Sequence, residues 1–149
     1  MSIEANKALV RRLYEEVFNK RNLAVADELL TETSLNHADP HGAGRVGPES
    51  LKGVVQMLTA GFPDFHMTLE DLVAEGDKVV VRITASGTHQ GAFMGIPPTG
   101  KRFTQQQIHL VRVVDGKVTE NWNVRDDLGM MQQLGVIPAP GHERREGAR

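Results

Sequence analysis

The fold is decided by residues 103–124, FTQQQIHLVRVVDGKVTENWNV, in which two alternating segments flank the dipeptide Asp115-Gly116. Alternation with a period of two is typical of a strand buried on one face, and Asp-Gly is a strong signal for a tight hairpin turn. The stretch therefore predicts an antiparallel pair of strands, 103–114 and 117 to about 124.

Two registers of this hairpin are open, and they differ in which residues share a face with His109. A two-residue turn places Trp122 and Asp126 on that face. A three-residue loop with a bulge at the glycine places Asn121 and Asn123 there instead.

Gln105, Gln107 and His109 share one face of the first strand in either register. This is an unusual amount of polarity for a surface that packs on a core, because an unpaired buried polar group costs free energy. The face therefore predicts a pocket with polar walls. A core histidine with satisfied hydrogen bonds is the structural alternative for His109.

A second pair of strands is expected before this hairpin. Residues 65–73 and 79–88 alternate on either side of Glu75-Gly76-Asp77, which predicts a turn. Between the two pairs, Pro97-Pro98 and the flanking glycines indicate a stiff connector without helix.

Three helices are expected in the N-terminal part of the chain. Apolar residues recur at three- and four-residue spacing from Ser2 to about Asn19, and Asn22 can cap a second helix. Gly47-Pro48 opens a third helix that ends at Gly61. Residues 35–42, between the second and third helices, should form a short strand that runs into a loop.

Helices followed by antiparallel strands indicate an α+β domain, with the helices on one face of a curved sheet and a pocket between the two layers. Asp126 or Asp127 should cap a short last helix, residues 128–134. The domain is expected to span residues 1–136. Residues 137–149 lack a core pattern and are expected to form a mobile tail.

Composition excludes several classes of function. The chain has 149 residues, a formal net charge of −2 and no cysteine, so it offers no disulfide, thiolate nucleophile or thiolate metal ligand. It has no basic run inside the domain, which argues against nucleic acid and anionic membranes as partners. No apolar stretch approaches the roughly 20 residues of a membrane-spanning helix, and no signal segment is visible, so we expect a soluble, cytoplasmic protein.

Several motifs occur together in the second half of the chain: Gly95-Ile96-Pro97-Pro98-Thr99, Arg102-Phe103, Gln107-Ile108-His109-Leu110, Val114-Asp115-Gly116-Lys117 and Gln133-Leu134-Gly135. Through them the chain resembles the SnoaL-like polyketide cyclases, or ester cyclases, of the superfamily that includes ketosteroid isomerase, scytalone dehydratase and limonene epoxide hydrolase. The resemblance implies a cone-shaped, cystatin-like α+β barrel. It also implies a ring closure without metal or cofactor, in which a carboxylate removes a proton α to a carbonyl.

The resemblance implies that Asn36, Gln107 and His109 line the ligand pocket. It also contains one departure, because the aspartate that acts as acid and base in the family falls on Asn123 when the chain is aligned without gaps from His109 to Gly135. An amide cannot abstract that proton, although it can hydrogen-bond to an enolate or carbonyl oxygen.

The acid/base role is therefore assigned to His109, Asp126 and Asp39 as candidate catalytic residues. Asp126 has the alternative of a plain helix cap, and Asp39, before Pro40, that of a turn former. The candidate substrate-binding residues are Tyr14, Asn36, His37, Gln105, Gln107, Trp122 and Asn123. For Tyr14 and Trp122, packing is the alternative.

Two classes of function remain. One is an enzyme that acts by proton transfer on a small carbonyl-bearing, largely apolar or polycyclic compound, by aldol cyclisation or isomerisation. The other is a binding domain that kept the pocket and lost the base. Epoxide hydrolysis, with Arg82 or Arg125, is a further option without a clear Asp-Arg-Asp set.

We expect no metal and no organic cofactor. His37, Asp39 and His41 alternate, but a proline-containing loop without a second cluster is a poor metal site. No strand-to-helix context surrounds a glycine-rich phosphate loop. The outer face of the sheet is expected to be covered by a second copy of the chain, which predicts a dimer or a pair of dimers.

Overall fold

The computed structural model describes residues 2–38 and 46–138. Its first helix, α1 (Ile3–Arg12), begins where Ser2 Oγ accepts a hydrogen bond from the Ala5 amide at 3.0 Å. It continues without a break into the π-helix η1 (Leu13–Asn19). The predicted helix over residues 2–19 is therefore confirmed, but its second half is wound more widely than an α-helix. Such π-helical turns occur frequently at functional sites.

The second helix is shorter than predicted. Helix α2 (Val25–Leu29) has Ala24 at its N-cap position without a side-chain hydrogen bond, so the predicted cap at Asn22 is wrong. Leu30, expected on the helix, begins strand β1 (Leu30–Asn36), which also starts five residues earlier than expected. Helix α3 (Gly47–Gly61) has the predicted bounds, with Pro48 in its first turn.

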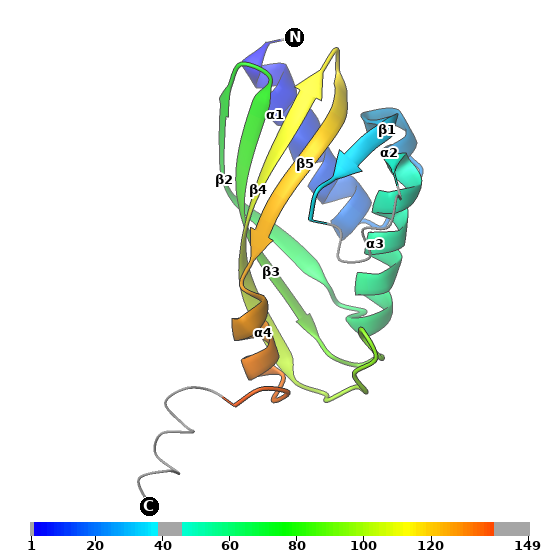
Figure 1. Cartoon of the computed structure of the whole chain (residues 1–149), viewed down its shortest axis with the longest axis vertical. Helices are drawn as coiled ribbons and strands as arrows, with labels where there is room; N and C mark the ends of the chain where they lie inside the picture. Colours follow the sequence, from blue (N-terminus) through cyan, green and yellow to red (C-terminus); the bar gives the residue numbers. More distant parts are fainter. Residues whose placement is uncertain (1, 39–45, 139–149) are drawn as a thin grey trace, which may run out of the picture.

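The strands form one sheet in the order β1-β5-β4-β3-β2. Its other members are β2 (His66–Glu75), β3 (Lys78–Thr88), β4 (Arg102–Val114) and β5 (Lys117–Arg125), and α4 (Asp127–Gln133) closes the domain. The sheet is curved, and α1 to α3 lie on one side of it (Figure 1). The predicted α+β class is confirmed. One pairing differs from the predicted antiparallel sheet, because β1 runs parallel to β5.

The hairpin adopts neither predicted register in full. Asp115 and Gly116 have φ values of 50° and 74°, and Val114 pairs with Lys117, as in a two-residue turn. The register then shifts at Thr119, an extra residue in β5 that has no partner in β4.

This bulge decides which side chains of β5 face the helices. Beyond it, His109 pairs with Asn123, and Gln107 pairs with Arg125. Because directly paired residues share a face, Asn123 and Arg125 lie on the side of His109 while Trp122 lies on the other side. The residues of β5 that share a face with His109 are those predicted for the bulged register, although the bulge is at Thr119 and not at Gly116.

The core lies between the helices and the concave face of the sheet. Strand β3 contributes Val79, Val81, Ile83 and Ala85, each fully buried. Opposite them, η1 buries Leu13, Tyr14, Val17 and Phe18. Burial of apolar surface of this kind stabilises a domain by roughly 25 cal/mol per Å².

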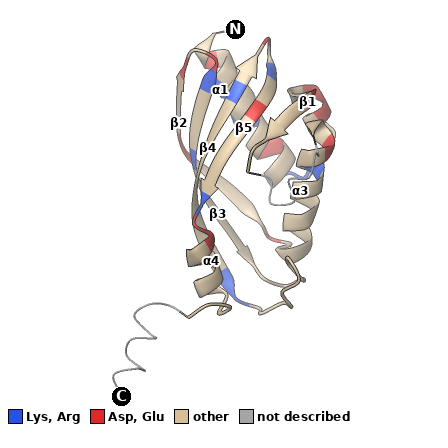
Figure 2. Cartoon of the chain, in the orientation of Figure 1, with Lys and Arg blue, Asp and Glu red and all other residues tan. Residues whose placement is uncertain are grey.

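Charged residues of both signs are interspersed over the elements (Figure 2). Many form exposed ion pairs, such as Arg82 with Asp71 and Arg12 with Glu28. Within the described residues, no helix has the length and apolar character needed to cross a membrane.

Candidate functional site

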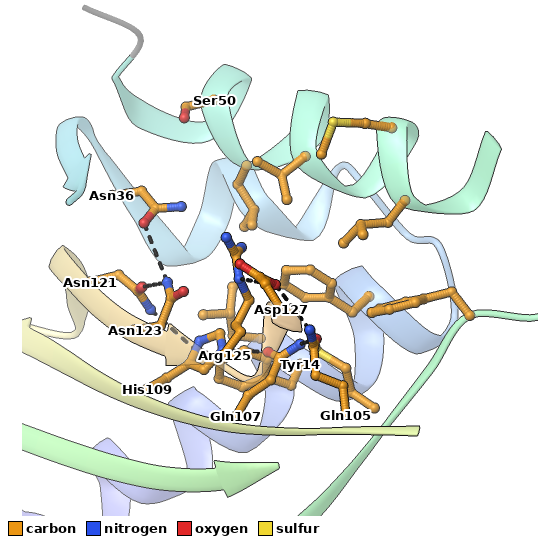
Figure 3. A pocket seen from close by; sticks show the side chains of 18 of the residues that line it. Tyr14, Asn36, Ser50, Gln105, Gln107, His109, Asn121, Asn123, Arg125 and Asp127 are labelled. Carbon is orange, nitrogen blue, oxygen red and sulfur yellow. Dashed lines mark hydrogen bonds and ion pairs between the residues drawn. The ribbon is translucent and has the colours of Figure 1, made fainter. Parts of the chain in front are cut away.

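A cavity of about 220 Å³ lies between the sheet, η1, α3 and α4 (Figure 3). Its polar lining combines residues from six elements: Tyr14, Ser34, Asn36, Ser50, Gln105, Gln107, His109, Asn121, Asn123, Arg125 and Asp127. The predicted pocket between helices and sheet is therefore present. Of the predicted site residues, it brings together Tyr14, Asn36, Gln105, Gln107, His109 and Asn123.

A chain of hydrogen bonds crosses the floor of the cavity along β4. Tyr14 Oη lies 2.7 Å from His109 Nδ1, and His109 Nε2 lies 2.7 Å from Gln107 Oε1. Gln107 Nε2 donates to Gln105 Oε1 at 2.7 Å, and Gln105 Nε2 donates to Asp127 Oδ1 at 3.0 Å. Each member is thereby held in one rotamer.

The carboxylate of Asp127 fixes the direction of this chain. An ionised carboxylate only accepts, so Gln105 must turn its NH2 group toward Asp127 and its oxygen toward Gln107. Gln107 must then present its oxygen to His109 Nε2, which therefore carries the ring proton. His109 Nδ1 is left as an acceptor, and the Tyr14 hydroxyl donates to it.

Burial agrees with this neutral histidine. Burial, with a smaller contribution from the positive charge of Arg125, lowers the pKa of His109 to about 3. Burial also raises the pKa of Tyr14, opposed by the hydrogen bond from Asn121. Both groups are therefore uncharged near neutral pH, and His109 is a weak base there.

Three asparagines extend the chain beyond Tyr14. Asn121 Nδ2 donates to Tyr14 Oη at 3.3 Å, and Asn123 Nδ2 donates to Asn121 Oδ1 at 2.7 Å. Asn123 Nδ2 also lies 3.4 Å from Asn36 Oδ1, which accepts from the Ala38 amide at 3.0 Å. Asn123 Oδ1 is buried and has no hydrogen-bond partner among the described residues.

Arg125 and Asp127 form the charged part of the cavity. Arg125 Nε lies 3.6 Å from Asp127 Oδ1, and the Asp127 side chain is 59% exposed while that of Arg125 is 29% exposed. Among the described lining residues, Asp127 is the one carboxylate and Arg125 the one permanent cation. A group that accepts a proton and a group that stabilises negative charge therefore lie next to each other.

The remaining walls are apolar and rich in methionine. Every methionine in the described part of the chain lines the cavity: Met57, Met67, Met94, Met130 and Met131. Phenylalanines accompany them at positions 18, 65, 93 and 103. Thioethers adapt to irregular shapes and make favourable contacts with aromatic rings, which suits a flat unsaturated ligand.

Three predicted site residues do not line this cavity. Asp126 Oδ1 accepts from the Gly129 amide at 2.9 Å as the N-cap of α4, and it is the neighbouring Asp127 that faces inward. Trp122 is on the outer face because of the Thr119 bulge, where it stacks on His37 with ring centroids 4.8 Å apart. The predicted pocket positions of Asp126, Trp122 and His37 are therefore wrong. Asp39 and His41 lie outside the described residues.

The epoxide hydrolase arrangement is also not formed. Arg82 Nε pairs with Asp71 Oδ2 at 2.7 Å between β2 and β3, away from the cavity, and Arg125 has one carboxylate beside it. No group of three potential metal ligands of the His, Asp or Glu type occurs within the described residues.

Asn121, Arg125 and Asp127 are lining residues that were not among the predicted site residues. The alternation of β5 carries the signal for the first two, since they lie two residues before and two residues after Asn123. Using that signal requires the correct register. For Asp127 the sequence indicated only a possible helix cap, and the neighbouring Asp126 is the residue that caps α4.

The fold and the site together define a small α+β protein with a ligand cavity. Hydrogen-bonded polar side chains of β4 and β5 line one side of the cavity, its other walls are apolar, and it contains one ionic pair. The chain belongs to the SnoaL-like polyketide cyclase family, whose model matches residues 8–134. It is 36% identical over 129 residues to the aklanonic acid methyl ester cyclase DauD of Streptomyces sp. (strain C5), covering 85% of this chain and 80% of DauD.

Solved structures agree with this placement. TsrD from Streptomyces laurentii superposes with a TM-score of 0.83 at 29% identity and covers 92% of this chain and 99% of its own. Wild-type IdmH from Streptomyces antibioticus superposes with a TM-score of 0.75 at 36% identity, covering 87% of this chain and 98% of its own.

Proposed function

We propose that this protein closes a ring in a carbonyl-bearing aromatic polyketide by intramolecular aldol addition, without metal or cofactor. The observation that carries the proposal is the Arg125–Asp127 pair, a carboxylate and a guanidinium at one end of an otherwise apolar and amide-lined cavity. The names of relatives such as DauD support the choice of substrate class.

In this proposal Asp127 is the general base. Its carboxylate takes a proton from the carbon α to a carbonyl, and the resulting enolate carbon attacks a second carbonyl carbon of the same molecule. One carbon–carbon bond forms, one carbon–oxygen π bond becomes an alkoxide, and protonated Asp127 returns the proton to that oxygen. Protons and electrons balance, so no external reagent is required.

Arg125 stabilises the negative charge that develops on the enolate oxygen. Its Nε contacts Asp127, whereas its terminal nitrogens have no hydrogen-bond partner among the described residues. Fixed donors beside a developing oxyanion usually make a large contribution to rate.

The hydrogen-bonded side chains of Gln105, Gln107 and His109 position the base. Gln105 donates to Asp127 Oδ1, and Gln105 is itself oriented through Gln107 and neutral His109. The predicted acid/base role of His109 is replaced in this proposal by a positioning role, because both of its ring nitrogens are already engaged, by Tyr14 Oη and by Gln107 Oε1.

The proposal is tested by comparing Asp127→Asn with Asp126→Asn. We expect Asp127→Asn to lower turnover of aklanonic acid methyl ester roughly a hundredfold or more, as is usual for loss of a general base. Asp126→Asn is the matched control, since asparagine caps helices about as well as aspartate and this side chain does not line the cavity. Equal activity of both variants would exclude Asp127 as the base.

A binding domain without catalysis is the second candidate. The observation that favours it is Asn123, an amide at the position of the family's acid/base aspartate. It would be supported if wild type and Asp127→Asn bound the ester with the same affinity and neither converted it.

We further propose that the protein forms a dimer through the outer face of the sheet. Ile108, Trp122 and Val124 lie on that face and are 48%, 37% and 70% exposed. Ile108 pairs with Val124 across β4 and β5, so the exposed apolar side chains are contiguous, and such patches commonly mark interfaces.

The cytoplasmic location stays a prediction.

A further inference from the structure

We propose that Arg21 is a positioning residue, which holds two phenylalanines of the cavity wall in place and thereby limits the bulk of the ligand that fits between them. The inference rests on the proposed function only in taking the ligand of the cavity to be the substrate. Arg21 follows the end of η1 and does not itself line the cavity. It acts through the backbone of residues that do.

The guanidinium group of Arg21 bonds to four backbone carbonyls in two separate segments. Nη1 donates to the carbonyl of Phe18 and, at 3.1 Å, to that of Asn19, both at the end of η1. Nη2 donates to the carbonyls of Pro63 and Phe65, at 3.2 and 2.8 Å, in the connection from α3 to β2. Because a guanidinium group is planar and rigid, this bridge sets the separation of the two segments.

The two ends of the bridge are also part of the cavity wall. Phe18 and Phe65 line the cavity and are 5% and 3% exposed. Each has its carbonyl bound to the same guanidinium group, so the two rings cannot move apart without loss of a hydrogen bond to a charged donor, which is stronger than a neutral one. Arg21 therefore controls how far this part of the wall can yield.

The surroundings of Arg21 show that its partners are carbonyls rather than a carboxylate. Burial lowers the pKa of Arg21, opposed by the negative charge of Asp64. Asp64 accepts from the amide and the hydroxyl of Thr88, at 2.7 and 2.8 Å, and lies 3.6 Å from Arg102. Arg21 also has a φ of 61°, a left-handed conformation that costs free energy for a residue with a Cβ. A lysine would keep the charge but lacks the fork that joins two segments.

The position of the two phenylalanines decides which part of a ligand meets them. Phe65 directly precedes β2, and strands β3 and β4 separate β2 from Arg125 on β5. An apolar substituent is expected to point to the side of Phe65, because it would remove water from the ionic pair on the other side. A bulky group then meets rings whose backbone is fixed, and forcing extra volume into a packed wall costs free energy.

The test compares 2-methylanthraquinone with 2-tert-butylanthraquinone, which differ only in the bulk of an apolar substituent, by equilibrium binding without turnover. We expect wild type to bind the methyl compound roughly tenfold more tightly. In Arg21→Gly this preference should disappear, and glycine suits the left-handed backbone, so the loss of the guanidinium group is not compounded by strain. Millimolar guanidinium chloride should restore the preference in this variant, because the free ion offers the same planar donors.

Two controls separate positioning from other effects. Val111→Ala should lose stability and keep the wild-type preference, since Val111 is fully buried and does not line the cavity. Asp127→Asn should also keep the preference although it is expected to be inactive. Full activity of Asp127→Asn would therefore refute the proposed base without affecting this inference.

If Arg21→Gly does not fold, Arg21→Lys takes its place, and it should lose the preference although it keeps the charge. Equal binding of the two probes by wild type, failure of both to bind, or a preference that persists without the guanidinium group would each overturn the proposal. So would a preference that guanidinium does not restore in Arg21→Gly, or one that Val111→Ala loses as well.

Discussion

His109 is kept neutral mainly by its burial, and this has a consequence for stability. Its pKa is about 3 in the folded protein, whereas a histidine in an unfolded chain has a pKa of roughly 6.5. Between these values the unfolded state binds a proton that the folded state does not, so the free energy of unfolding falls as the pH falls. The contribution is fully present above the unfolded pKa.

We therefore expect His109 to account for a loss of up to about 1.4 kcal/mol of unfolding free energy per pH unit between pH 6 and pH 4. Denaturant unfolding of wild type and His109→Gln at several pH values measures it. The unfolding free energy of wild type should fall more steeply with falling pH than that of the variant, since the variant lacks this proton linkage. Parallel curves would show that His109 is not buried as a neutral group.

Asn123 shows how far a residue can be interpreted without its neighbours. From sequence, an aspartate at this position would be expected to restore weak aldol activity, because it returns a carboxylate next to Gln107. The structure places the oxygens of Asn121 and Asn36 against Nδ2 of Asn123. A carboxylate there would face two acceptors, which raises its pKa.

We expect Asn123→Asp to be destabilised and to gain no turnover of aklanonic acid methyl ester over wild type near neutral pH. The physical reason is the repulsion between the carboxylate and the two amide oxygens. Steady-state turnover and thermal unfolding of the same preparation measure both effects. An increase in turnover would mean that the asparagines reorient and that position 123 can act as the base.

At the scale of elements, the Asn19 side chain links the end of η1 to the beginning of strand β2. Its Nδ2 donates to the Met67 carbonyl at 2.8 Å, and its Oδ1 accepts from the Met67 amide at 2.8 Å. The side chain thus satisfies both backbone groups of one residue in β2. This contact sets where η1, and with it Tyr14, lies relative to the cavity.

Asn19→Ala should lower the free energy of unfolding by roughly 2 kcal/mol, because it leaves two partly buried backbone groups unpaired. Asn22→Ala is a matched control, since the Asn22 side chain does not cap α2, and we expect a change within about 0.5 kcal/mol. Denaturant unfolding measures both. Similar losses in the two variants would contradict the special role of Asn19.

At the scale of the whole molecule, the proposed dimer can be followed with the single tryptophan of the chain. Trp122 lies on the outer face of the sheet, so its fluorescence reports on contact at that face. We expect sedimentation of wild type at micromolar concentration to give at least twice the 16.4 kDa mass of one chain. Val124→Glu should shift the protein toward the monomer and move Trp122 emission to longer wavelength, because a charge would be buried at the interface.

Ile3→Glu replaces an exposed apolar residue of α1, on the other side of the sheet, and is the matched control for the added charge. It should leave both the mass and the emission unchanged. A single-chain mass for wild type would exclude the dimer, and a dimer that persists in Val124→Glu would place the interface elsewhere.

Local patterns were sufficient for much of the fold. The spacing of apolar residues in 2–19, Gly47-Pro48 at the start of α3, and Asp115-Gly116 at the hairpin act through the nearest few residues, so the sequence predicts them correctly. The polar face of β4 was also predictable, because alternation alone places Gln105, Gln107 and His109 together. Three of the five family motifs lie in β4 or at this hairpin.

The composition of the site was decided by tertiary structure. A single unpaired residue, Thr119, turns Asn121, Asn123 and Arg125 inward and Trp122 outward, and no local pattern distinguishes that register from its alternatives. The choice between Asp126 and Asp127 depends on which one α4 uses as its cap. The protonation of His109 and the orientation of each amide depend on a hydrogen-bond chain that joins η1, β4, β5 and α4, because the direction of each bond is set by its neighbour and only the folded chain makes them neighbours.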